Sequence, residues 1–155
     1  MSILDRFKRK KEASKVGFED GFMDLQSQLI SLCLEVVEGR ADKIYAYASM
    51  EEKSQSFNAF FEIDGEVKSI NDLDISEDLM DQCLMLGTED LMKIRELCAC
   101  HNRERPTEIK MVHNVKSGKF DSDYKYEEVC SAKTGLTAHE VFYDWFDEVK
   151  AGSNE

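Results

Sequence analysis

The chain has 155 residues, of which 34% are charged and 42% are hydrophobic, and its formal net charge is −12 at pH 7. This length and composition predict one globular domain, and no apolar run approaches the roughly 18 residues that span a bilayer. The negative charge argues against direct binding to nucleic acid or to an anionic membrane, and it favours a partner protein with a basic surface.

The charge is distributed unevenly along the chain. Residues 1–16 contain six Lys/Arg and two acids, so they contribute +4 and the remaining chain carries −16. We expect residues 1–18 to form a flexible basic arm, residues 19–151 to form a single α+β domain, and residues 152–155 to form a disordered tail. The basic start is not followed by the apolar segment of a signal peptide, and the five cysteines contain no CxxC pair. Both features predict a cytoplasmic protein with free thiols.

The first half of the domain shows a helix followed by three strands. Apolar residues at helical spacing predict a helix over about residues 20–38, with Gly39 as its C-terminal stop. Two alternating, aromatic-rich strands are predicted at 43–50 and 56–64, and Asp64-Gly65 predicts a turn into a short strand at 66–70. Tyr45, Tyr47 and Phe60 fall on the second face of these strands, opposite the main apolar face.

An acidic segment follows and becomes helical. Residues 62–90 contain one base, Lys68, and ten acids: Glu62, Asp64, Glu66, Asp72, Asp74, Glu77, Asp78, Asp81, Glu89 and Asp90. Either Ser76 or the pair Asp74 and Glu77 can cap a helix here. Gly87 and Thr88 interrupt the pattern, which predicts two consecutive helices or one kinked helix. The acids lack the DxDxDG spacing of a calcium loop, so we expect an acidic surface and neither a metal nor a cofactor.

Residues 107–127 are predicted to form a hairpin closed across Ser117 and Gly118. A loop centred there would place Met111 opposite Tyr124 and His113 opposite Ser122, so that residues of the inward face meet one another. Asp121 and Asp123 lie on the opposite, charged face of the hairpin.

The last helix begins at the clearest start signal in the chain. Thr137 and Glu140 form a capping box, and Trp145 belongs to an apolar stripe along the helix that follows. We predict that this helix packs on the apolar face of the hairpin. The complete pattern predicts an α+β domain with an antiparallel sheet of about five strands and helices packed on it, in the order α-βββ-α(α)-ββ-α.

The sequence does not favour catalysis. No phosphate-binding glycine loop, nucleophile elbow or zinc-protease helix occurs in it. His113 opposite Ser122 resembles a base beside a hydroxyl, but the pattern supplies neither an orienting carboxylate nor an oxyanion hole. We therefore interpret His113 as a core histidine with satisfied hydrogen bonds, and we predict that the chain is not an enzyme.

Three stretches resemble the YezG-like immunity proteins of bacterial toxin systems. They are SGKFDSDYKYEE (117–128), KIYAYASM (43–50) and SFNAFFEIDGEVKSINDLD (56–74), and the order of the elements is similar over roughly residues 20–150. The resemblance implies a cytoplasmic antitoxin that binds and occludes a cognate toxin domain, often a nuclease. The charge agrees independently, because a nuclease surface that holds phosphates is basic and attracts an acidic protein.

The predicted partner-binding residues fall in two groups. Association would be steered by the acids Glu62, Asp64, Glu66, Asp72, Asp74, Glu77, Asp78, Asp81, Asp121 and Asp123. Tyr45, Tyr47 and Phe60 would serve as aromatic anchors if their face of the sheet is uncovered. The alternative function is a non-enzymatic regulatory adaptor that binds a basic housekeeping protein.

Overall fold

The computed structural model describes residues 17–153 and confirms the predicted α+β fold. The elements are α2 (Phe18–Val36), β1 (Lys43–Met50), β2 (Gln55–Ile63), β3 (Glu66–Ser69), the 3-10 helix η1 (Ile70–Asp72), α3 (Glu77–Cys100), β4 (Glu108–Asn114), β5 (Phe120–Lys125) and α4 (Ala138–Ser153). The predicted basic arm lies outside the described residues as far as residue 16, and its last residue, Phe18, begins α2. At the other end, α4 continues to Ser153, so only residues 154–155 of the predicted tail lie outside the described range.

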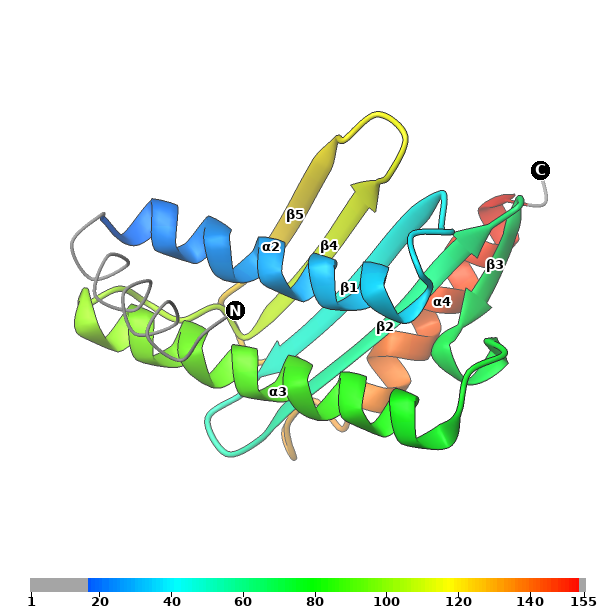
Figure 1. The fold of residues 1–155 in the computed structure, drawn as a ribbon. Helices are drawn as coiled ribbons and strands as arrows, with labels where there is room; N and C mark the ends of the chain where they lie inside the picture. The colour runs from blue at the N-terminus through cyan, green and yellow to red at the C-terminus, as the bar shows by residue number, and fades with distance from the viewer. Residues whose placement is uncertain (1–16, 154–155) are drawn as a thin grey trace.

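One antiparallel sheet in the order β3-β2-β1-β4-β5 forms the middle layer of the domain. Figure 1 shows α2 and α3 side by side across one face of this sheet and α4 on the other face. The central strand β1 is therefore covered on both sides, and β3 and β5 form the two edges.

Alternation along β1 divides the interior into two clusters. Ile44, Ala46, Ala48 and Met50 point towards α2 and α3, while Tyr45 and Tyr47 point towards α4. The two alanines leave room for the helices to approach the sheet closely, and the tyrosines join Phe60, Phe142 and Trp145 in the second cluster. Both faces of the sheet thus contribute to the core.

Gly87 lies within α3, which is a single helix of 24 residues capped by the side chain of Ser76. A Cβ atom at this glycine would lie 2.1 Å from the Cδ1 atom of Phe57 on β2. The glycine is therefore required for close approach of helix and sheet. The sequence predicted either two helices or one kinked helix. A glycine that ends a helix and a glycine that allows a helix to pack closely interrupt the apolar pattern in the same way, so the sequence alone does not distinguish them.

The predicted register of the β4–β5 hairpin is wrong by two residues. Met111 pairs with Ser122, and His113 pairs with Phe120. The turn is closed by a hydrogen bond from the amide of Gly118 to the carbonyl of Asn114, 2.8 Å long, with Gly118 at φ 76. A shift of two residues keeps every side chain on its predicted face, so alternation alone cannot detect it.

The predicted position of the last helix is also wrong. The inward face of the hairpin is covered by α2, where the amide nitrogen Nε2 of Gln26 lies 3.0 Å from the hydroxyl of Tyr124. The helix α4 packs instead against Tyr45, Tyr47 and Phe60. The sequence signal for its start was correct, since the amide of Glu140 donates to the Thr137 hydroxyl over 3.1 Å.

Candidate partner-binding surface

Most of the predicted acidic residues lie at the end of the domain marked by β3. We call this set the acidic edge, and it consists of Glu62, Asp64, Glu66, Asp72, Asp74, Glu77, Asp78 and Asp81. All of them are exposed except Glu62, which is half-buried. They follow one another through the β2–β3 turn, η1 and the first turns of α3, which Figure 1 shows along one end of the molecule.

Some of these acids have structural roles. The carboxylate of Asp72 accepts hydrogen bonds from the amide and the hydroxyl of Ser69, at 3.2 and 3.0 Å, and so fixes η1 against β3. Glu77 and Asp78 occupy the first turn of α3, where the positive end of the helix dipole favours carboxylates. The local fold therefore holds these carboxylates at defined positions on the surface.

Two lysines neutralise only part of the acidic edge. Lys43 lies 3.9 Å from Glu62, and Lys68 lies 3.5 Å from Glu66. Such partly exposed pairs contribute at most about 1 kcal/mol each. Five acids of the acidic edge have no ion pair within residues 17–153 and no hydrogen bond of the kind that Asp72 makes. They are Asp64, Asp74, Glu77, Asp78 and Asp81. The acidic edge therefore presents uncompensated negative charge.

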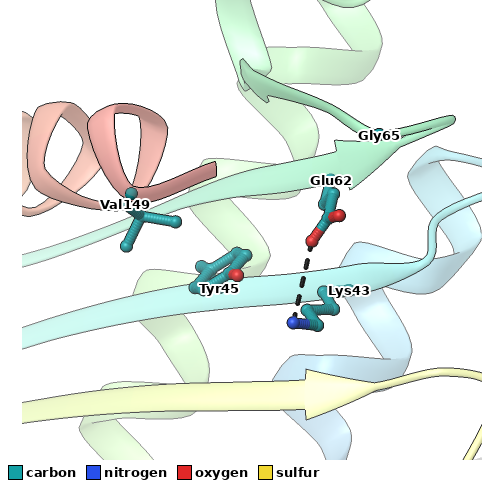
Figure 2. Close-up of a pocket in the computed structure, with 6 residues that line it drawn as sticks. Lys43, Tyr45, Glu62, Gly65 and Val149 are labelled. Atoms are coloured by element: carbon teal, nitrogen blue, oxygen red, sulfur yellow. Dashed lines mark ion pairs between the residues drawn. The ribbon is translucent and has the colours of Figure 1, made fainter. Parts of the chain in front are cut away.

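A hollow of about 440 Å³ opens beside the β2–β3 turn. It is lined by Lys43, Tyr45, Glu62, Gly65, Val149 and Gly152. Figure 2 shows the carboxylate of Glu62 pointing towards Lys43, with Tyr45 between this pair and Val149 of α4. Burial raises the pKa of Tyr45, and the nearby charge of Glu62 raises it further. The phenol of Tyr45 is therefore neutral at pH 7 where it lines the hollow, beside the ion pair of Lys43 and Glu62.

Asp121 and Asp123 do not belong to the acidic edge. They lie on β5, at the opposite margin of the sheet from β3. Four strand spacings of about 4.8 Å each place the two margins about 19 Å apart. The ten predicted acids therefore fall in two separate groups, which the sequence could not show because strand order cannot be read from local patterns.

The three aromatic residues predicted as anchors are buried. Tyr45 is 7% exposed, and Tyr47 and Phe60 are fully enclosed beneath α4. The rings of Tyr45 and Phe60 are stacked with centroids 4.4 Å apart. Their face of the sheet is covered, so these residues stabilise the core and are not available to a partner.

A second acidic surface, missed in the sequence, lies on the outer face of α4. It consists of four exposed residues: Glu140, Asp144, Asp147 and Glu148. The helix is joined to η1, which carries Asp72 of the acidic edge, by a hydrogen bond of 3.1 Å from the side-chain amide of Asn71 to the hydroxyl of Tyr143. The signal was present, because these acids alternate with the apolar stripe of the helix.

A buried polar cluster that the sequence did not indicate lies where β1 ends and β4 begins. The hydroxyl of Tyr47 donates to the carboxylate of Glu108 over 3.0 Å. The carboxylate of Glu51, only 6% exposed, accepts the amides of Val129 and Cys130 at 2.9 Å each. The cluster thereby fastens the β5–α4 loop to the sheet.

The phenol of Tyr47 and the thiol of Cys130 in this cluster are held in their neutral forms. Burial raises the pKa of Tyr47 well above its ordinary value, and the charge of Glu108 adds to the shift. Burial also raises the pKa of Cys130, although hydrogen bonds with Tyr47 and Ser49 oppose the increase. A thiol with a raised pKa is a poor nucleophile at neutral pH, so this arrangement serves structure better than catalysis.

His113 departs from its predicted environment. Its ring lies 6.3 Å from that of Phe120, and its Nδ1 atom is buried without a hydrogen-bond partner among the described residues. The prediction that His113 has satisfied hydrogen bonds is therefore wrong for its Nδ1 atom. Ser122 is also not the cross-strand neighbour of His113. Ser122 instead donates to the side-chain oxygen of Gln26 over 2.6 Å.

Two further properties bear on function. Within residues 17–153, no group of three or more His, Cys, Asp or Glu side chains is placed to hold a metal ion. In the same part of the chain, every helix is too short or too polar to cross a membrane. The acidic edge therefore remains the most distinctive feature of the described surface.

Comparison with known proteins adds no function. The chain matches no protein-family model and no curated protein sequence. A functional conclusion must therefore rest on the surface itself, together with the sequence features described above.

Proposed function

We propose that this chain is an immunity protein, similar to the YezG-like family, that binds and neutralises a toxin domain with a basic surface. The observation that carries this proposal is the acidic edge, where exposed carboxylates outnumber the two nearby lysines and five of them have no ion pair among the described residues. An acidic surface of this kind attracts a basic protein and repels nucleic acid.

The proposed mechanism is electrostatic steering followed by occlusion. Carboxylates on a hairpin turn, on η1 and at a helix start are carried by regular backbone structure, so little backbone entropy is lost when they meet a partner. A toxin domain that binds phosphates, such as a nuclease, must present basic groups at its active site. Occupation of those groups by the acidic edge would block access of the toxin's substrate.

The proposal is tested with the product of the gene adjacent to the one that encodes this chain, because an immunity gene is expected beside that of its toxin. Co-expression should restore the growth of cells that produce this toxin, and the two purified proteins should form a stable complex. Absence of both rescue and complex would contradict the proposal. A regulatory adaptor would instead bind a housekeeping protein and would not respond to toxin expression.

A matched pair of variants shows whether the acidic edge is responsible. Asp74→Lys with Asp81→Lys changes two unpaired acids of this surface, whereas Asp24→Lys with Glu35→Lys makes the same change in charge on the exposed side of α2. Only the first variant should lose rescue. Equal loss in both would mean that net charge, and not this surface, determines binding.

A further inference from the structure

The strand β5 forms an open edge of the sheet, at the margin opposite the acidic edge. The backbone amides and carbonyls of its odd-numbered residues point towards β4. The carbonyl of Lys119 accepts a hydrogen bond from the amide of Asn114 over 2.9 Å, and the carbonyl of Lys125 accepts one from the hydroxyl of Thr107 over 3.1 Å. Backbone direction alternates along a strand, so the amides and carbonyls of Phe120, Ser122 and Tyr124 point away from the sheet. No backbone hydrogen bond reaches them from residues 17–153.

The other edge of the sheet offers less open backbone. The strand β3 has only four residues, and the amide of Ser69 at its end is bound by the carboxylate of Asp72. Edge strands are commonly protected by shortness or by caps of this kind. Figure 1 shows β5 as a longer strand at the free margin of the sheet. The longer stretch of open hydrogen-bonding backbone is therefore that of β5.

The side chains beside this edge differ between the two faces of the sheet. On the α4 side are Asp121 and Asp123, both exposed. Asp121 lies 3.8 Å from Lys119 in a solvent-exposed pair. Asp123 has no ion pair among the described residues, because Lys110, its cross-strand neighbour, is placed over the ring of Trp145 with its Nζ atom 5.6 Å from the ring centre. This face of the edge is negatively charged.

The opposite face of the edge offers an apolar contact. Met23 of α2 is 42% exposed, although its neighbours in the helix are packed against the sheet. The sulfur of Met23 lies 3.8 Å from the side-chain nitrogen of Gln26, which in turn lies 3.0 Å from the hydroxyl of Tyr124. Met23 therefore lies beside β5, where it can contact a side chain on an added strand.

We propose that β5 binds an extended segment of a partner protein as an additional strand, with Lys or Arg side chains along one face and apolar side chains along the other. The backbone of Phe120, Ser122 and Tyr124 supplies the hydrogen bonds. Asp121 and Asp123 select the basic face, and Met23 contacts the apolar face. This site is separate from the acidic edge and goes beyond the proposed function.

A second copy of this chain is disfavoured at the same edge. The two antiparallel registers with the longest overlap of two β5 strands place Asp121 opposite Asp123, or Asp123 opposite itself. Directly opposed like charges destabilise a pair of strands. The charge of the edge thus favours a basic strand from another protein over self-association.

A short synthetic peptide in which lysine alternates with valine is the probe, and a peptide of the same composition with its lysines grouped together is the control. Calorimetric titration of the full chain should show binding of the alternating peptide about tenfold tighter than the grouped one. Equal affinities would contradict the proposal, because they would reflect charge attraction alone.

The matched variants are Ser122→Pro and Ser122→Ala. Both remove the hydroxyl that donates to Gln26, but only proline removes the outward amide, a position at which an edge strand tolerates proline. The alternating peptide should bind Ser122→Pro about tenfold more weakly than Ser122→Ala. Equal binding by these two variants would overturn the proposal.

Amide hydrogen exchange in the unaltered chain tests the same site without a folding risk. Addition of the alternating peptide should slow exchange at Phe120, Ser122 and Tyr124. Unchanged exchange at all three amides would contradict strand addition. A dimer that forms without peptide and is lost in Ser122→Pro would also contradict it, by identifying a second copy as the occupant. None of these results depends on the toxin, so they are distinguishable from failure of the proposed function.

Discussion

Tyr47 places its phenol between β1 and α4, where it donates to a carboxylate that is itself almost fully buried. Its pKa is raised above the ordinary value of 10.0 by burial and then by Glu108. Above pH 10.0 the unfolded chain loses the phenolic proton while the folded chain retains it. The contribution of Tyr47 to stability is therefore complete below the unfolded pKa and is lost as the pH rises beyond it.

The change Tyr47→Phe tests this relationship. The free energy of unfolding, measured with urea from about pH 8 to about pH 11, should fall less steeply with pH in the variant than in the parent chain. The variant should also be less stable by about 1–3 kcal/mol at neutral pH, because Glu108 loses its buried donor. Parallel curves above pH 10.0 would contradict the assigned environment of Tyr47.

Gly87 gives a prediction in which two effects oppose each other. Alanine has a higher helix propensity than glycine by about 1 kcal/mol. At this position the added Cβ would meet the ring of Phe57 at 2.1 Å, and overpacking of that kind costs about 1–3 kcal/mol. We expect Gly87→Ala to be destabilising in thermal or urea unfolding.

Two further variants show whether contact with Phe57 is the cause of the expected destabilisation. Gly87→Ala combined with Phe57→Leu should be less destabilising than the sum of the two single changes, because the smaller side chain admits the methyl group. Gly152→Ala, where nothing lies within 4 Å of the added atom, should be close to neutral. A stabilising effect of Gly87→Ala alone would show that helix and sheet are not closely packed there.

At the scale of elements, the β5–α4 loop depends on one carboxylate. Glu51 accepts two backbone amides of this loop from a position at the end of β1. Glu51→Ala should lower the free energy of unfolding by about 2 kcal/mol and accelerate amide exchange at Val129 and Cys130. Glu51→Gln retains a side-chain oxygen and should restore part of the loss. Exchange at these two amides that is unchanged from the parent chain in Glu51→Ala would show that the loop is held by other contacts.

The elements themselves were largely predictable, whereas their arrangement was less so. The bounds of β1 agree with the prediction at both ends, because alternation and aromatic residues define a strand locally. The face on which α4 packs could not be predicted, since β1 and β2 are apolar on both faces and local patterns contain no information on which face a helix covers. The predicted register of the hairpin was wrong by two residues. Side-chain alternation has a period of two, so a shift of two residues leaves the pattern on each face unchanged.

The candidate site was predictable in part. Clustering of acids in residues 62–81 already indicated one acidic region, and the structure places these acids at one end of the domain. The position of Asp121 and Asp123 depends on strand order, which long-range pairing determines. The Glu51 and Glu108 contacts join residues far apart in the chain, so no local signal could reveal them.

At the scale of the whole molecule, the two margins of the sheet have different properties. The β3 margin presents unpaired carboxylates beside a short strand with a capped end, and the β5 margin presents open backbone groups beside two acids. Figure 1 shows these margins at opposite sides of the sheet. One partner can therefore be attracted at the acidic edge without covering β5, and the two surfaces can be altered independently.

The most direct test of the central proposal is the association rate between this chain and the product of the adjacent gene, measured at low and at high ionic strength. Exposed charges are screened beyond about 10 Å at 0.1 M salt, so steering by the acidic edge must weaken as salt increases. We predict that Asp74→Lys with Asp81→Lys slows association at low salt and removes most of its salt dependence, whereas Asp24→Lys with Glu35→Lys does neither. A rate independent of salt, or equal effects of the two double variants, would contradict the account.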